Sequence, residues 1–213
     1  MAESLNWQPL GREEMAARLA HDIPEGWSVN LGIGIPTLVG NFVPKEREVV
    51  FHSENGILGM GPAPPSGQEN AWLVNASRQH VTLLPGGSFM SHSDSFALVR
   101  GGHLDLCVLG GFQVAENGDL ANWARSEDDN APAIGGAMDL AAGARRIWVV
   151  MEHITRSGEK RLLDRCTYPL TAAACVKRVY TDLAVIDVTP KGFIVAEIVP
   201  GLSFDELQEK TGA

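Results

Sequence analysis

Leu104-Asp105-Leu106-Cys107-Val108-Leu109, followed directly by Gly110-Gly111, is the stretch that decides the fold. The run is almost continuously apolar and ends in a glycine turn, which is typical of a parallel strand covered on both faces. A second run of this kind occupies residues 146–151. Segments with helical periodicity stand between the apolar runs, so strands alternate with helices. We therefore predict an α/β fold with an open, mainly parallel sheet and helices on both faces.

The other elements follow from apolar spacing and from turn residues. Residues 12–23 predict an amphipathic helix, in which Glu14 and Arg18 are spaced to pair on the solvent side. Further helices are expected at 37–42, 91–98, 135–144 and 171–179, and further strands at 27–31, 49–52 and 81–84. Residues 183–188 and 193–199 predict a C-terminal hairpin. Ser203 and Glu206 form a capping box for a last helix.

Composition limits the class of protein. The chain has 213 residues, with 17 Lys and Arg against 26 Asp and Glu, which gives a net charge of −9. We expect a single domain over residues 1–213 that needs no disulfide or metal for stability. The charge argues against nucleic acid or an anionic membrane as a partner, and no apolar run reaches membrane-spanning length. The N-terminus has no signal-peptide pattern, and Cys107, Cys166 and Cys175 are expected to be reduced thiols in a cytoplasmic protein.

Ser53-Glu54-Asn55-Gly56 is the strongest candidate for a functional site. It follows the apolar run 49–51 and precedes a glycine-rich stretch. A strand that breaks into such a turn holds the residue at the break in a fixed place, usually at the sheet edge where ligands bind. The carboxylate of Glu54 could there serve as a nucleophile, as a base or as a ligand to a charged group.

Other sites have weaker support in the sequence. Gly32 and Gly34 let the backbone approach a ligand closely, but Thr37 stands where a dinucleotide fingerprint needs its third glycine. No phosphate-binding Gly-Lys-Ser/Thr loop and no histidine pair with metal-ligand spacing occurs. Residues 91–95 contain the residue types of a hydrolytic triad, but they are too close in sequence to form one, so we predict a capped helix N-terminus. His52 is interpreted as a structural histidine.

Several long motifs, in order, resemble the B subunit of the 3-oxoacid CoA-transferase family. The matching text covers almost the whole chain. It consists of residues 30–36 (NLGIGIP), 53–59 (SENGILG), 100–103 (RGGH), 118–123 (GDLANW), 135–140 (GGAMDL) and 166–171 (CTYPLT).

The resemblance implies a role for each candidate. Glu54 would be the covalent nucleophile that carries CoA as a glutamyl thioester. The backbone N–H of Gly136 would donate to the thioester oxyanion, and Gly135 would allow the close approach. Asn30, Gly32 and Gly34 would contact the substrate or CoA. No permanently bound cofactor is implied, since the CoA thioester is itself a substrate, and no metal is expected.

The chain also departs from the family pattern. Residues 126–134 are acidic where relatives carry a basic residue and a glycine, and Ser77-Arg78 replaces Gly-Lys. Arg78 would keep a cation for a CoA phosphate, with a different geometry. The resemblance further implies a partner, the family's A subunit, in a heterodimer or heterotetramer.

The substrate stays open at this level. Succinyl-CoA as donor and 3-oxoadipate as acceptor are favoured, with acetoacetate as the alternative acceptor. The distal carboxylate of 3-oxoadipate calls for a cation, for which Arg78, Arg100, Arg125 and Arg156 are candidates on this chain. Two other functions remain: an acyl-CoA hydrolase that uses Glu54 as a base, and a ligand-sensing protein without enzymatic activity.

Overall fold

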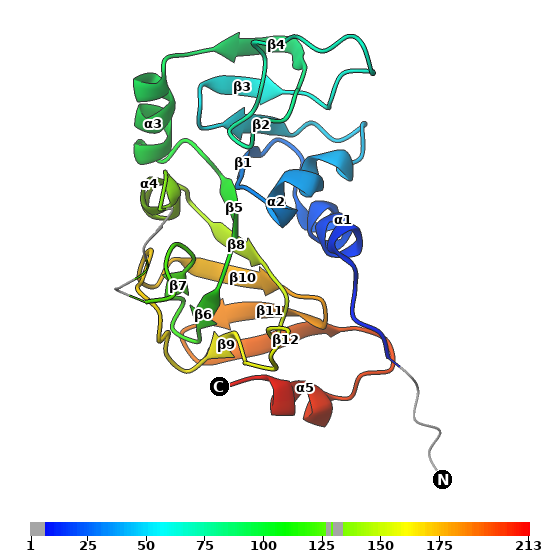
Figure 1. The fold of residues 1–213 in the computed structure, drawn as a ribbon, viewed down its shortest axis with the longest axis vertical. Helices are drawn as coiled ribbons and strands as arrows, with labels where there is room; N and C mark the ends of the chain where they lie inside the picture. Colours follow the sequence, from blue (N-terminus) through cyan, green and yellow to red (C-terminus); the bar gives the residue numbers. More distant parts are fainter. Residues whose placement is uncertain (1–6, 127–128, 130–133) are drawn as a thin grey trace.

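Nine strands form one sheet in the order β12-β11-β10-β8-β5-β1-β2-β3-β4 (Figure 1). The computed structural model describes residues 7–126, 129 and 134–213. The five central strands pair in parallel, and they are β10 (Val176–Tyr180), β8 (Ile147–Val150), β5 (Leu106–Gly110), β1 (Ser28–Leu31) and β2 (Val50–Ser53). Antiparallel strands extend both edges: β3 (Ile57–Met60) and β4 (Leu83–Phe89) on one side, β11 (Ala184–Thr189) and β12 (Gly192–Ile198) on the other. Only β3 and β11 oppose the common direction, so the predicted mainly parallel sheet is confirmed.

Helices cover both faces of the sheet because its central strands are apolar on both faces. Successive residues of β5 and β8 belong in turn to two separate hydrophobic cores. One core is closed by α3 (His92–Arg100), α4 (Ala137–Gly143) and α5 (Phe204–Lys210). The other core is closed by α1 (Arg12–Asp22), α2 (Ile35–Leu38) and the 3-10 helix Val39–Asn41. Figure 1 shows α1 and α2 on the side opposite α3 and α4.

The C-terminal region forms as predicted. β11 and β12 make the expected hairpin, and Ser203 and Glu206 cap α5 reciprocally in a capping box. A small second sheet, which the sequence did not indicate, lies beside them in the order β7-β6-β9. Its strands are β6 (Gln113–Ala115), β7 (Leu120–Ala121) and β9 (Leu162–Leu163).

The prediction of a helix over residues 171–179 is wrong. Residues 176–180 form β10, which pairs in parallel with β8 and antiparallel with β11. The alanine-rich text favours a helix, but Ala174 has φ +50°, which interrupts any helix there. Val176 and Val179 are buried in the core shared with β8, so tertiary packing overrides local propensity.

Two further differences concern the start of the chain and its first hairpin. Glu14 does not pair with Arg18: its carboxylate accepts the Gly11 N–H at 2.6 Å, while Arg18 pairs with Asp22 and Glu197. The stretch 57–60, interpreted from its glycines as part of a turn, is strand β3. A glycine inside a short strand weakens the alternating pattern that identifies strands.

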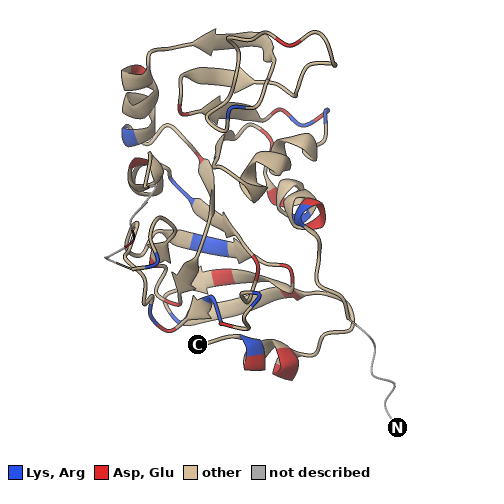
Figure 2. Ribbon diagram, in the orientation of Figure 1, with Lys and Arg blue, Asp and Glu red and all other residues tan. Residues whose placement is uncertain are grey.

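Of the acidic stretch 126–134, residues 127–128 and 130–133 lie outside the described residues. All three cysteines are free, with Cys107 buried. Both signs of charge alternate along the ribbon, for example on α1 and α5 (Figure 2). Within the described ranges, no helix is long and apolar enough to cross a bilayer.

Candidate active site

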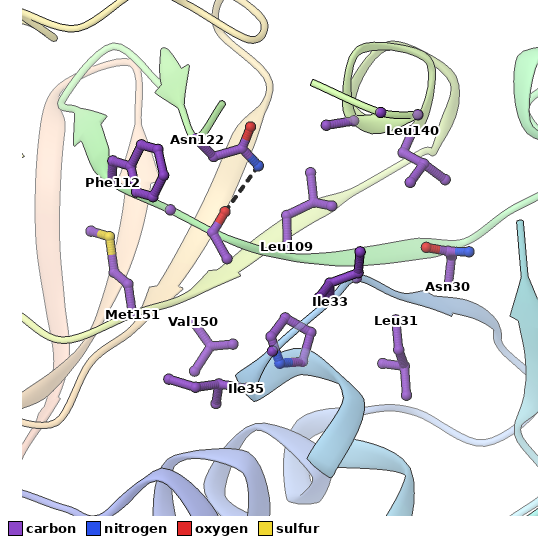
Figure 3. Close-up of a pocket in the computed structure, with 18 of the residues that line it drawn as sticks. Asn30, Leu31, Ile33, Ile35, Leu109, Phe112, Asn122, Leu140, Val150 and Met151 are labelled. Atoms are coloured by element: carbon purple, nitrogen blue, oxygen red, sulfur yellow. Dashed lines mark hydrogen bonds between the residues drawn. The ribbon is translucent and has the colours of Figure 1, made fainter. Parts of the chain in front are cut away.

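A pocket of about 370 Å³ lies at the carboxyl ends of the central strands. In Figure 3, Asn30 lies at one end of this pocket and Phe112 and Met151 at the other, with apolar side chains such as Ile33 and Leu109 between them. Six of the seven residues singled out from the sequence line it, drawn from three separate segments: Asn30, Gly32, Gly34, Glu54, Gly135 and Gly136. The seventh, Arg78, is exposed and is not among the lining residues.

Glu54 is held where β2 ends by a turn that its neighbours fix. The Gly56 N–H donates to the Ser53 carbonyl at 2.9 Å, and Gly56 has φ +109°. A side chain at Gly56 would place its Cβ 2.2 Å from the Met90 carbonyl oxygen, so only glycine fits. Ser53 Oγ accepts the Ala76 N–H at 2.9 Å, which ties the turn to the following loop. The position of Glu54 is therefore set by backbone contacts on both sides.

The Glu54 carboxylate is half-buried and makes no hydrogen bond or ion pair with the described residues. Burial raises its pKa, and the nearby imidazole of His92 on α3 opposes this shift when protonated. A carboxylate that is partly stripped of water and has no fixed partner is more reactive than a solvated one. Its geometry suits attack on a bound electrophile.

Gly136 faces Glu54 across the pocket. A Cβ built on Gly136 would lie 2.6 Å from Glu54 Oε2 and 2.7 Å from Cζ of Phe96. The Glu54 carboxylate and the Phe96 ring therefore both pack against Gly136. Gly135 has φ +49° and leads into α4. Within the described part of the chain, the N–H groups of Gly135 and Gly136 donate no hydrogen bond. The turn that borders the carboxylate thus offers two backbone donors that no described acceptor occupies.

Asn30, which the resemblance assigns to contact with the substrate or CoA, lines the pocket, but its side-chain amide is bonded to other protein groups. Its side chain is only 2% exposed. The amide nitrogen lies 3.0 Å from His52 Nδ1 and donates to the His52 carbonyl at 3.3 Å, while Oδ1 accepts Cys107 Sγ–H at 3.5 Å. The amide group is therefore engaged with the protein, and His52 is the buried structural histidine that was predicted.

Gly32 and Gly34 form the turn between β1 and α2. The Gly32 N–H donates to the Val108 carbonyl at 2.8 Å, and a Cβ on Gly32 would lie 3.0 Å from the same oxygen. The close approach joins β1 to β5 at the pocket floor. Pro36 sits in the first turn of α2, as predicted.

The cations proposed for a distal carboxylate are dispersed. Arg100 pairs with Asp139 at 2.8 Å. Arg125 and Arg156 line a second, adjoining hollow, and the guanidinium of Arg125 lies 5.4 Å from the Phe112 ring centroid. Phe112 lines both this hollow and the pocket that contains Glu54, so Arg125 and Arg156 lie beside that pocket. Arg100 lines neither of the two.

Sequence reasoning missed the polar group at the far end of the pocket. Arg161 donates to Glu152 at 2.8 Å and to the carbonyl of Gly111 at 2.6 Å, and Arg12 reaches the other oxygen of Glu152 at 3.4 Å. Asn122 donates to the Gly110 carbonyl at 3.0 Å (Figure 3). No local motif indicates these residues, because they come from distant segments of the chain.

Among the described side chains, no group of three His, Cys, Asp or Glu could hold a metal ion.

Comparison with known proteins identifies the family of the chain. The sequence profile of the coenzyme A transferase family matches residues 12–210. The chain is 59% identical over 203 residues to the B subunit of 3-oxoadipate CoA-transferase from Pseudomonas putida, with 95% of each chain covered. It is 45% identical over 202 residues to the B subunit of succinyl-CoA:3-ketoacid coenzyme A transferase from Helicobacter pylori, covering 95% of this chain and 97% of that one. Glutaconate coenzyme A-transferase from Acidaminococcus fermentans has the same fold, with a TM-score of 0.72 at 17% identity, covering 98% of this chain and 86% of that one.

The chain therefore belongs to the coenzyme A transferase family. The relatives from Pseudomonas putida and Helicobacter pylori are both named as B subunits, so the resemblance inferred from the sequence motifs is confirmed.

Substituting Gly136 by alanine should displace the Glu54 carboxylate, because the added Cβ would overlap Oε2. We expect kcat/KM of the assembled enzyme to fall by about a hundredfold, the usual cost of an ångström-scale misplacement. Gly40→Ala is the matched control, since its Cβ would meet only Leu31 Cδ1 at 3.4 Å, and its kinetics should stay at the wild-type level. Wild-type kinetics in Gly136→Ala would contradict the geometry described here.

Glu54→Gln should stabilise the folded chain at neutral pH. Because burial raises the pKa of Glu54, the folded state binds this proton more tightly than the unfolded state does. The favourable contribution of Glu54 is therefore present below its unfolded pKa and is lost as pH rises through the folded pKa. We expect the free energy of unfolding to rise at pH 7 by less than about 1 kcal/mol, because solvent screens the exposed half of the carboxylate.

Urea unfolding of both chains between pH 7 and pH 4.5 measures this effect, and the gain should shrink as the pH falls. Glu46→Gln, at an exposed glutamate with no ion pair to a described residue, should show no such gain. An equal gain in both variants would refute the assignment to burial of Glu54.

Proposed function

We propose that this chain is the B subunit of a 3-oxoacid CoA-transferase that moves CoA from succinyl-CoA to a 3-oxoacid, with 3-oxoadipate preferred over acetoacetate. The observation that carries the proposal is the half-buried Glu54 carboxylate, which pairs with no described residue and is bordered by the Gly135-Gly136 turn, whose N–H groups donate to none. Such a carboxylate is suited to covalent catalysis at a thioester.

The first half-reaction consumes the donor. An oxygen of Glu54 attacks the thioester carbonyl of succinyl-CoA, the C–S bond breaks, and CoA leaves as a thiolate, which gives a mixed anhydride of succinate and Glu54. The thiolate then attacks the glutamyl carbonyl of that anhydride, and succinate leaves. The product is a thioester between Glu54 and CoA.

The second half-reaction runs the same steps in reverse with the acceptor. Its carboxylate attacks the glutamyl thioester, and CoA thiolate leaves and then attacks the acceptor carbonyl, which releases Glu54 as a carboxylate. Each step exchanges groups of similar energy, so the reaction needs placement and oxyanion stabilisation rather than ATP. Support for that stabilisation comes from the N–H groups of the turn next to Glu54 Oε2.

The shape of the pocket supports a long ligand. Its apolar walls continue from Asn30 past Leu109 to Phe112 and Met151 (Figure 3), which suits the pantetheine arm of CoA. Arg78 is exposed and makes no ion pair with a described residue, so it is available at the surface to a CoA phosphate.

A second kind of subunit is expected to complete the site. Ile33 lines the pocket and yet is 71% exposed, and Met138 on α4 is 52% exposed. Large apolar side chains left open at a pocket rim are typical of a surface that a partner covers. We propose that this partner is the family's A subunit, which agrees with the naming of both relatives.

Replacing Glu54 by alanine should abolish transfer. In the enzyme assembled with its partner, we expect kcat to fall by roughly a thousandfold or more, as for other covalent nucleophiles. Incubation of the wild type with succinyl-CoA and borohydride should reduce the Glu54 thioester to an alcohol, which peptide mass analysis detects. Glu46→Ala serves as the control for both measurements. Full turnover by Glu54→Ala, or reduction at another residue, would exclude this mechanism.

The acceptor preference is measured by kcat/KM for 3-oxoadipate and for acetoacetate in the same assembled enzyme. We expect 3-oxoadipate to be favoured by at least about tenfold, because a distal carboxylate adds a charge-assisted contact. Release of free thiol without an acceptor should be slow compared with transfer. Rapid release would instead favour an acyl-CoA hydrolase with Glu54 as base.

A further inference from the structure

A buried chain of polar side chains runs beneath Glu54 and has no part in the mechanism above. Cys107 on β5, Asn30 on β1, His52 on β2 and Ser95 on α3 are joined in this order by hydrogen bonds. None is more than 2% exposed. The chain thus connects three adjacent strands to the helix that flanks the site.

The hydrogen bonds fix the proton positions. The Asn30 amide nitrogen can only donate, so His52 Nδ1, 3.0 Å away, accepts. His52 Nε2 therefore carries the proton and donates to Ser95 Oγ at 2.8 Å. Burial lowers the pKa of His52 to about 4, which keeps the imidazole neutral and preserves this arrangement at neutral pH.

The same helix forms one wall of the active site. Phe96, the residue after Ser95, packs against Gly136 on the side where Gly136 meets Glu54 Oε2. His92 packs on Phe96 with ring centroids 4.8 Å apart, and it opposes the rise in the Glu54 pKa. The position of α3 therefore sets both the shape and the charge around Glu54.

Burying an imidazole, an amide, a hydroxyl and a thiol carries a desolvation cost that an apolar core at these positions would avoid. One hydrogen bond joins His52 on β2 to Ser95 on α3, and a hydrogen bond requires a defined direction between its two atoms. A directional bond fixes the rotation and height of α3 on the sheet more narrowly than apolar packing does.

We propose that His52 is a positioning residue for the reaction at Glu54: by bonding Asn30 on β1 and Ser95 on α3 at once, it holds His92 and Phe96 against the carboxylate. This inference rests on the proposed function of Glu54 and adds a residue to it. His52 touches neither the substrate nor the reacting atoms in this role.

The test uses His52→Leu, His52→Gln and Ser95→Ala in the enzyme assembled with its partner. We expect His52→Leu to lower kcat by about ten- to a hundredfold through misplacement of the α3 wall, while KM for succinyl-CoA changes by less than about threefold. The acid limb of kcat/KM should move to higher pH, because Glu54 loses the opposing influence of His92. Among the described titratable groups, Cys107 also interacts electrostatically with Glu54, and burial raises the pKa of its thiol, so it stays neutral.

Glutamine can accept from Asn30 and donate to Ser95, so His52→Gln should restore most of kcat and return the acid limb toward its wild-type position. Ser95→Ala removes only the hydrogen bond from His52 to α3. It should lower kcat and move the acid limb of kcat/KM to higher pH, as His52→Leu does. It also keeps the proposal testable if His52→Leu fails to fold.

His153→Leu is the matched control for stability. His153 is likewise fully buried and bridges two hydroxyls, Thr181 Oγ1 and Thr211 Oγ1, each at 3.0 Å, and it is not among the residues that line the pocket. It should lower the melting temperature as His52→Leu does but leave the acid limb in place. The proposal is overturned if Ser95→Ala keeps the wild-type kcat and acid limb, or if His153→Leu shifts the acid limb equally.

Glu54→Ala, measured alongside, separates the two levels. Turnover by Glu54→Ala would refute the proposed function itself. An inactive Glu54→Ala together with wild-type behaviour of the His52 and Ser95 variants would refute only the positioning role.

Discussion

The active site depends on one physical constraint, which is that the Glu54 carboxylate is held partly out of water without a fixed partner. This desolvation costs free energy. Glu54 has no hydrogen-bond partner among the described residues, and burial raises its pKa. No described group at the carboxylate itself keeps it in place, so its position must come from the backbone. The turn supplies this through the Gly56 bond to Ser53 and the contact of Gly56 with Met90, where no side chain would fit.

The sheet carries that turn on a rigid base. β1, β2 and β5 lie side by side in parallel, so their carboxyl ends meet at one edge of the sheet. Their apolar side chains are buried on both faces, which leaves little freedom for the strands to shift. At these carboxyl ends the apolar runs give way to polar residues and glycines, so the pocket forms at that edge of the sheet.

Local sequence patterns identified most of the fold where local and tertiary preferences agree. The continuous apolar runs predicted β5 and β8, and the capping box predicted α5. Residues 171–179 show the limit: alanine-rich text favours a helix, but the partners β8 and β11 are formed by chain segments that a local pattern does not contain. The same holds for Arg18, whose partner Glu197 lies 179 residues away in the sequence.

For the candidate site, the sequence by itself determined which groups are present: a glutamate at a strand end, and the glycine pairs at 32 and 34 and at 135 and 136. These follow from residue type and spacing, which act over a few residues. Only the tertiary structure decided which groups meet. It placed Gly136 against Glu54, turned the Asn30 amide toward His52, left Arg78 outside the pocket, and joined Arg161 to Glu152. The physical reason is that strand order and helix packing bring together residues far apart in the chain, and the cost of burying their polar atoms selects the partners.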